Sequence, residues 1–228
     1  VPGEQPKDMQ YIKLNTNENP YPPSPRVKTV MDSFDDAKMR LYPDTNSTVL
    51  VDALAQKYNV KPSQIFVGVG SDDVISMAFL TFFNSDKAVL FPDVTYSFYD
   101  VWADVYRIPY KTKALDENFR IIPDDYKCEN GGIIFPNPNA PTGVFESLDT
   151  IEEIIKANLD SIVIIDEAYI DFGGESCIPL VEKYENLLVV QTFSKSRSMA
   201  GMRIGFAIGN EKLIKFMFII ILEKMNIL

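Results

Sequence analysis

Short apolar runs alternate with stretches of helical periodicity along most of the chain. Residues 162–165 and 187–190 are uninterrupted apolar runs bounded by polar residues, which is typical of strands buried on both faces. Apolar side chains at helical spacing predict an amphipathic helix over residues 48–58. We expect further strands at residues 64–69, 87–91, 107–110, 132–135 and 204–208, and further helices at residues 27–35, 73–83, from about 95, 150–158 and 178–184.

Strands that alternate with helices over this length predict an α/β fold, a three-layer αβα arrangement around a mostly parallel sheet. The last strand, at residues 204–208, is expected to run antiparallel. Polar side chains follow two of the buried strands: Asp166 after one, and a turn with Thr192, Ser194 and Lys195 after the other. Ligands of open α/β sheets bind outside the carboxyl ends of the strands. The sequence therefore predicts a site that contains Asp166 and Lys195.

The residues at this site favour one class of cofactor. A lysine can form a Schiff base with a carbonyl if its neighbours lower its pKa, although a lone lysine is more often a solvated surface residue. Arg203 and the hydroxyl groups around Lys195 would suit an anionic phosphate. Pyridoxal 5'-phosphate (PLP) is an aldehyde with a phosphate, and a carboxylate keeps its ring protonated as an electron sink. Asp166 could supply that carboxylate, and Tyr169 could hydrogen-bond the ring hydroxyl.

The strand that ends at Asp166 has a competing interpretation. Four apolar residues followed by Asp-Glu resemble the Walker B strand of a nucleotide-binding protein. That class requires a glycine-rich loop ending in Gly-Lys-Ser or Gly-Lys-Thr, and the chain has no such segment. We therefore favour the PLP interpretation.

A second strand end would contribute to the phosphate site. Gly70, Ser71 and Asp72 form a tight turn after the strand at 64–69 and open the next helix. Such a turn offers free backbone N–H groups and the positive end of a helix dipole, so we assign these three residues to the cofactor phosphate. The alternative is a plain turn in which Ser71 or Asp72 caps the helix. Tyr96, at the start of the helix expected from about residue 95, could stack on the pyridine ring.

Composition narrows the function classes. The chain has 228 residues, 46% of them apolar, and a formal charge of −10, which argues against a nucleic-acid surface. It contains no histidine, which excludes Ser-His-Asp triads and histidine-based zinc sites, and we expect no metal. Two cysteines make no disulfide framework, which fits a cytoplasmic protein. The apolar run at residues 213–222 is too short to span a membrane, so we expect no membrane partner.

Four segments together carry a family resemblance. They are LNTNENPYPP at residues 14–23, NPNAPTG at 137–143, DEAYIDF at 166–172 and TFSKSRSMAGMRIGF at 192–206. In this order and spacing they resemble the aminotransferases of PLP fold type I, and most of all the histidinol-phosphate aminotransferase branch, over residues 1–216. The resemblance implies the large domain of that fold. It also implies that Lys195 holds PLP as an internal Schiff base and later moves a proton between the substrate carbon and the cofactor.

The resemblance also assigns residues that the pattern alone does not. It places Tyr42 in the active site of a partner subunit, at the cofactor phosphate, which implies a homodimer. Asn17, Asn19 and Tyr21 would lie near the substrate. The family usually has asparagine directly before Pro-Thr-Gly, bonded to the ring hydroxyl, whereas this chain has Ala140 there. We expect Asn139 to take that role, or Tyr169 if Asn139 cannot reach. The full set of cofactor-binding residues expected is Tyr42, Gly70, Ser71, Asp72, Tyr96, Asn139, Asp166, Tyr169, Thr192, Ser194, Lys195 and Arg203.

The expected organisation is an N-terminal extended arm at residues 1–30, a large PLP-binding domain at 31–212 and the start of a connecting helix at 213–228. The family's small C-terminal domain, with the arginine that grips the substrate carboxylate, would be absent. The resemblance implies amino transfer between histidinol phosphate, an amino-alcohol phosphate, and a 2-oxo acid in histidine biosynthesis. Two alternatives stay open: a PLP-dependent decarboxylase of a phosphorylated amino acid, and a non-catalytic fragment that only binds PLP or dimerises.

Overall fold

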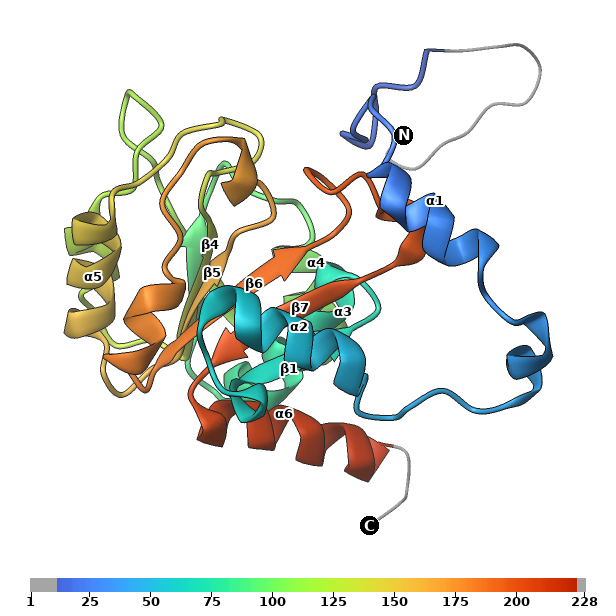
Figure 1. Cartoon of the computed structure of the whole chain (residues 1–228). Coiled ribbons are helices and arrows are strands. Elements are labelled where there is room, and N and C mark those ends of the chain that lie inside the picture. Colours follow the sequence, from blue (N-terminus) through green and yellow to red (C-terminus); the bar gives the residue numbers. More distant parts are fainter. Residues whose placement is uncertain (1–11, 225–228) are drawn as a thin grey trace.

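The computed structural model of the chain describes residues 12–224, and the side chains of residues 12–220. Within these residues one seven-stranded sheet has the order β1-β7-β6-β5-β4-β2-β3 (Figure 1). β7 is antiparallel to β1 and to β6, and the other neighbouring strands are parallel. The α/β fold class and the antiparallel last strand are therefore confirmed. The strands are β1 (Ile65–Gly68), β2 (Val89–Pro92), β3 (Tyr110–Lys113), β4 (Gly132–Pro136), β5 (Val163–Asp166), β6 (Leu187–Thr192) and β7 (Gly205–Gly209).

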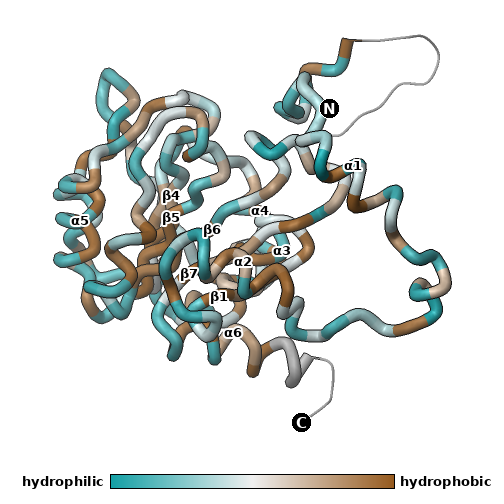
Figure 2. Tube along the Cα trace, viewed as in Figure 1, coloured by the Kyte–Doolittle hydropathy of each residue, from teal (hydrophilic) through white to brown (hydrophobic). Residues whose placement is uncertain are grey.

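Helices cover both faces of the sheet. They are α2 (Thr48–Tyr58), α3 (Ser71–Ala78), α4 (Tyr99–Tyr106), α5 (Leu148–Ala157) and α6 (Glu211–Lys224), whereas α1 (Pro25–Asp32) does not pack on the sheet. Successive strand residues point to opposite faces. In β5, Val163 and Ile165 pack in the same cluster as α2 and α5, whereas Ile164 packs with α3, α4 and α6. The tube in Figure 2 shows the strands largely hydrophobic and the outer helices mixed, as a sheet covered on both faces requires.

One helix and one strand begin away from the expected positions. The helix expected from about residue 95 begins at Tyr99, because the Asp93 carboxylate accepts the N–H groups of Val94 and Leu115 and holds the preceding loop against β3. The strand expected at 107–110 is β3 at Tyr110–Lys113, because Arg107 adopts φ +58° as the residue that ends α4.

Two other expectations change for local reasons. The helix expected at residues 178–184 is a short 3-10 helix, Ile178–Glu182, because the Glu167 carboxylate holds the Cys177 N–H and β6 begins at Leu187. Thr192, expected in the polar turn, is the last residue of β6 and pairs with Gly205. The turn that carries Lys195 therefore begins one residue later.

The segment before α2 stands off from the sheet (Figure 1). α1 begins at Pro25, a residue that favours the first turn of a helix, so among the described residues the extended part of the arm is 12–24. Neither α1 nor the 3-10 helix η1 (Asp36–Arg40) contains a buried residue. Residues 1–11, the first part of the expected arm, lie outside the described residues. The last part of the expected connecting helix, residues 225–228, lies outside them as well.

Candidate active site

The predicted site residues gather at one edge of the sheet. Asp166 is the last residue of β5, Lys195 follows β6, and Asn139 follows β4. Gly70 and Ser71 follow β1, which runs in the same direction as β6 because both are antiparallel to β7. This edge is where ligands of open α/β sheets bind. The sheet topology thus brings together residues that are far apart in the sequence.

Asp166 is a buried carboxylate with few partners. Asp166 is only 4% exposed. Oδ2 accepts from the Tyr99 hydroxyl at 3.0 Å, and Oδ1 accepts from the Ala168 N–H at 3.1 Å. Burial raises the pKa of Asp166 to about 6, and the hydrogen bonds from Tyr99 and the Ala168 N–H, with a smaller effect of the Lys195 charge, oppose this shift. Among residues 12–220, no lysine or arginine forms an ion pair with it, so a cationic group such as a protonated pyridine nitrogen would fit beside it.

Lys195 lies under the N-terminal arm. Its Nζ donates to the carbonyl oxygens of Thr16 at 3.0 Å and Asn17 at 3.4 Å, and lies 5.4 Å from the centre of the Tyr169 ring. Asn17 Nδ2 donates to the Tyr169 hydroxyl at 3.1 Å. Asn19 Nδ2 donates to the carbonyl oxygens of Lys195 at 3.2 Å and Ser196 at 3.3 Å. The structure therefore brings two of the expected arm residues to the expected lysine.

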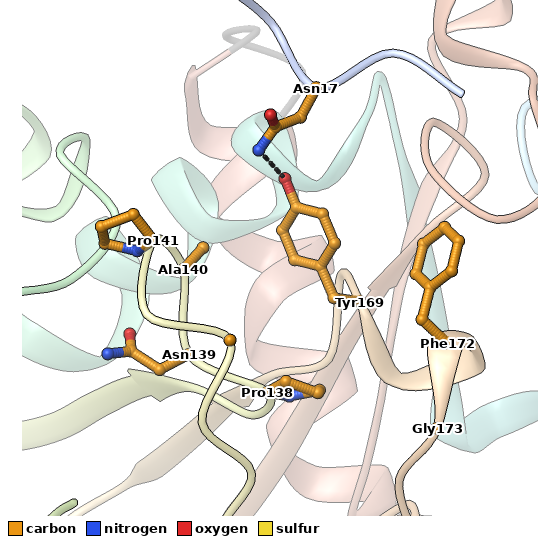
Figure 3. Close-up of a pocket in the computed structure, with 9 residues that line it drawn as sticks. Asn17, Pro138, Asn139, Ala140, Pro141, Tyr169, Phe172 and Gly173 are labelled. Atoms are coloured by element: carbon orange, nitrogen blue, oxygen red, sulfur yellow. Dashed lines mark hydrogen bonds between the residues drawn. The ribbon is translucent and has the colours of Figure 1, made fainter. Parts of the chain in front are cut away.

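A cavity of about 270 Å³ opens beside Tyr169 (Figure 3). Its size is near the lower end of the range of small-molecule sites, roughly 300–1,000 Å³. Figure 3 shows Asn17 from the arm and Tyr169 from the loop after β5 meeting above the loop after β4. The lining residues are Asn17, Pro138, Asn139, Ala140, Pro141, Gly143, Tyr169, Phe172 and Gly173.

Asn139 has an acceptor that no group of the described chain uses. Its Nδ2 donates to Val94 O at 2.9 Å and to Thr142 Oγ1 at 3.1 Å, which fixes the orientation of the amide. Its buried Oδ1 has no hydrogen-bond partner among the described residues. A buried acceptor without a donor is costly, so this oxygen suits a ligand hydroxyl. Ala140, at the family's usual asparagine position, has no side-chain group that could do this.

The turn after β1 is crowded at Gly70 and at Gly205. Gly70 has φ +88°, and a Cβ there would lie 2.3 Å from Arg203 Nη2. A Cβ at Gly205 would lie 2.3 Å from the Ser71 nitrogen. Because β1 pairs with β7, the first turn of α3 and the Arg203 guanidinium share one small space. Backbone N–H groups at a helix start and an arginine together suit a phosphate.

Other residues that are predicted to contact the cofactor phosphate or ring interact with one another. The Tyr96 hydroxyl donates to Asp72 Oδ1 at 2.7 Å, and Arg203 Nη2 lies 3.8 Å from Asp72 Oδ2. Thr192 Oγ1 donates to Ser194 Oγ at 2.9 Å. The pKa of Tyr96 is raised, first by burial and then by its hydrogen bond to Asp72, so its hydroxyl stays a donor.

Of the expected cofactor-binding residues, Asn139 and Tyr169 line this cavity, whereas Asp166, Lys195 and the phosphate-site residues do not. Tyr96 and the expected tyrosines of the N-terminal segment, Tyr21 and Tyr42, also lie outside the lining. The Tyr96 ring stacks on Phe98, with centroids 5.7 Å apart, in the loop before α4. Tyr21 is mostly exposed, and its N–H donates to Asn19 Oδ1 at 3.1 Å. Tyr42 is fully exposed, and it lies after η1, in the segment that stands off from the sheet. Within its own chain Tyr42 therefore does not reach the predicted site.

Sequence reasoning missed residues that support the site from behind. Tyr99 belongs to the core, and its hydroxyl also donates to Asp166. Glu167 and Gln191 are buried and bonded to each other through Gln191 Nε2 at 2.8 Å. A glutamine that directly follows the apolar run 187–190 is the one signal for this pair in the sequence. Nothing in the sequence links it to Glu167.

Residues 9–222 match the family described as aminotransferase class I and II. The chain is 57% identical over 94% of its length to histidinol-phosphate aminotransferase 1 of Hydrogenovibrio crunogenus, and 54% identical over 96% of its length to histidinol-phosphate aminotransferase of Lactococcus lactis subsp. cremoris. It spans only 60% and 61% of these relatives. The solved histidinol-phosphate aminotransferase of Sinorhizobium meliloti, a complex with pyridoxal-5'-phosphate, superimposes with a TM-score of 0.80 at 20% identity, over 87% of this chain and 56% of that one. The chain belongs to the class I and II aminotransferases.

Proposed function

We propose that this chain is the cofactor-binding part of a PLP-dependent aminotransferase. The observation that carries the proposal is the position of two residues at the ends of the neighbouring strands β5 and β6: the buried carboxylate of Asp166 after one and Lys195 after the other. The family match and the unpaired acceptor of Asn139 support the same cofactor. Bound PLP supplies the electron sink that stabilises a carbanion at the substrate carbon.

The residues of the chain would then divide the work between binding and proton transfer. The Asp166 carboxylate holds a proton on the pyridine nitrogen, and Tyr99 orients that carboxylate through its hydroxyl. Lys195 would anchor the cofactor through its Nζ, and the same Nζ would carry a proton between the substrate carbon and the cofactor. Asn139 Oδ1 accepts from the ring hydroxyl, with Tyr169 beside it.

Phosphate binding is assigned to the crowded space between β1 and β7. The turn at Gly70, Ser71 and Asp72 supplies backbone N–H groups, and Arg203 supplies the charge. Ser194 and Thr192 offer hydroxyl groups from the β6 side. We propose that Tyr96 contacts the ring from the loop before α4.

We further propose that the substrates are histidinol phosphate and a 2-oxo acid, as the names of the relatives suggest, and that Asn17, Asn19 and Tyr21 lie beside them.

The fully exposed Tyr42 and the unburied α1 and η1 support a homodimer in which Tyr42 completes the partner's phosphate site. We propose a large domain at residues 31–212, with the connecting segment beginning at residue 213. Both cysteines are free, which agrees with a cytoplasmic location. Among the described residues no helix has the length and apolarity to cross a membrane.

Borohydride reduction in the presence of PLP tests the cofactor and its anchor. We expect a visible absorption band, its loss on reduction, and a label that peptide mapping finds on Lys195. Lys195→Ala should lose both band and label, whereas Lys183→Ala, whose ion pair to Glu152 lies on α5, should keep them. A label spread over surface lysines in the unmodified chain would contradict the proposal.

Product analysis tests the reaction. When histidinol phosphate and 2-oxoglutarate are supplied to the chain, we expect the amino group to pass to 2-oxoglutarate, which gives glutamate and the ketone of histidinol phosphate. Release of CO₂ from a phosphorylated amino acid would replace the aminotransferase proposal with a decarboxylase. A bound PLP without either product would leave a binding fragment.

A further inference from the structure

Buried polar groups run behind the cavity, starting beside Asp166. Glu167 is the next residue and only 1% exposed. Its carboxylate accepts from the Ser176 hydroxyl and the Cys177 N–H, both at 2.6 Å, and from Gln191 Nε2 at 2.8 Å. Burial raises the pKa of Glu167 to about 7. A buried carboxyl with three donors is held in one place, so it fixes the Gln191 amide that it faces.

Gln191 connects this carboxyl to Arg197. Because its Nε2 donates to Glu167, its Oε1 faces the other way and accepts from the Tyr58 hydroxyl at 2.7 Å and from Arg197 Nη2 at 3.1 Å. Arg197 Nη2 also donates to the Tyr58 hydroxyl at 2.8 Å. One buried side chain of β6 thus joins the residue after Asp166 to the residue two positions after Lys195.

Arg197 is held from several sides and does not line the cavity. Nη1 donates to Thr192 O at 3.4 Å, and Nη2 lies 3.3 Å from Asp171 Oδ2. Its guanidinium carbon lies 4.7 Å from the centre of the Phe193 ring and 5.7 Å from that of Phe206. Asp171 also accepts from the Ser196 hydroxyl. These contacts reach the Lys195 turn from β6, from β7 and from the loop after β5.

We infer that Arg197, held by Gln191 and Glu167, is a positioning residue that fixes Lys195 against Asp166. Glu167 directly follows Asp166, and Arg197 lies two residues after Lys195, so the Glu167–Gln191–Arg197 contacts tie together the two backbone segments that carry the reacting groups. The inference rests on the proposed function, since it concerns the lysine that binds PLP. It assigns no contact with the cofactor to Arg197.

The arrangement requires arginine in particular. A guanidinium has several donors in one rigid plane and stacks on aromatic rings, whereas a lysine ammonium is a single point on a flexible stem. Lysine at position 197 would keep the charge beside Asp171 but could not bond Thr192 O, Tyr58 and Gln191 together. We therefore expect Arg197→Lys to be intermediate between the unchanged chain and Arg197→Met.

The test compares Arg197→Met and Arg197→Lys with the control Lys183→Met, which removes an ion pair on α5. The first readout needs no cofactor: amide hydrogen exchange in the peptide 192–199. We expect about tenfold faster exchange there in Arg197→Met, less in Arg197→Lys, and no change in the control. The second readout is the rate at which PLP becomes borohydride-trappable on Lys195. A misplacement of ~1 Å can cost ~100-fold in rate, so we expect a fall of about tenfold or more in Arg197→Met.

The outcomes separate the inference from the proposed function. Unchanged exchange and unchanged labelling in Arg197→Met would overturn the inference, and so would equal slowing in Arg197→Met and Lys183→Met, which would indicate a general loss of stability. If Arg197→Met does not fold, Arg197→Lys carries both readouts. If the unchanged chain takes up no PLP on Lys195, the proposed function fails, and the exchange comparison still decides whether Arg197 orders the Lys195 turn.

Discussion

The region around β5 and β6 and the segment before α2 are built in opposite ways. Every residue of β5 and β6 is buried, and the buried polar side chains there, such as Gln191 in β6 and Glu167 directly after β5, have partners within the chain. α1 and η1 bury nothing, although they carry several large apolar side chains. The first region obtains its conformation from its own packing. The second has apolar surface that this chain leaves uncovered, which agrees with the proposed dimer.

The sharpest test of this difference is the loss of one phenylalanine from each region. Phe135 in β4 is fully buried, and its replacement by alanine should lower the free energy of unfolding by ~3–5 kcal/mol through lost burial and a cavity. Phe34, 55% exposed after α1, should cost less than ~0.5 kcal/mol. Urea denaturation measures both. Equal effects would show that the segment before α2 packs as firmly as the sheet.

The buried charge of the first region should make its stability depend on pH. The pKa of Asp166 is raised to about 6, so folding opposes its ionisation. Stability contributed by the protonated form is lost as pH rises from the unfolded value near 4 to about 6. Compared with the unchanged chain, Asp166→Asn should therefore gain up to about 3 kcal/mol between pH 4 and pH 7, at 1.36 kcal/mol per pKa unit.

Melts of both proteins across this pH range, without and with PLP, measure the Asp166 effect. Bound PLP would give the carboxylate a cationic partner, so the difference should shrink or reverse when the cofactor is added. A difference that does not change with pH in the cofactor-free proteins would contradict the assigned burial of the charge.

We expect the phosphate turn, residues 70–72, to be less rigid than the buried strands and more rigid than the segment before α2. Glycine substitutions test this. Gly70→Ala would place a Cβ against the Arg203 guanidinium at φ +88°, so we expect a loss of ~1–3 kcal/mol in stability. Binding of inorganic phosphate or PLP should weaken as well. Gly201→Ala is the matched control, since a Cβ there meets nothing within 4 Å. Calorimetric titration and thermal melts of both variants decide whether the space at Gly70 is as crowded as described.

The smallest effect on stability is expected at Tyr42. Because this side chain is fully exposed, Tyr42→Ala should change the free energy of unfolding by less than ~0.5 kcal/mol. If Tyr42 contacts a second subunit, the same variant should weaken self-association in sedimentation equilibrium or bind PLP less tightly as a dimer. Unchanged association and unchanged PLP affinity would contradict its assignment to the partner's site.

The elements predicted best are those whose signal is local. The runs that became β5 and β6 are apolar throughout, and the glycine at position 70 marks the turn that opens α3. The start of α4 was misplaced because the Asp93 carboxylate binds Leu115, a contact across 22 positions that no local pattern reports. The hydrogen bond from Tyr99 to Asp166 was not predicted for the same reason, since it joins residues 67 positions apart.

The sequence by itself determined which residues are available for chemistry. Asp166 and Lys195 each follow an apolar run, and that local order places them at strand ends. Only the tertiary structure decided how they meet. β7 lies between β1 and β6, which brings Gly70 against Arg203, and the packing of α4 buries Asp166 under Tyr99. Strand order and burial depend on contacts between distant segments, and those contacts decide which carboxyl is desolvated and which arginine is locked in place.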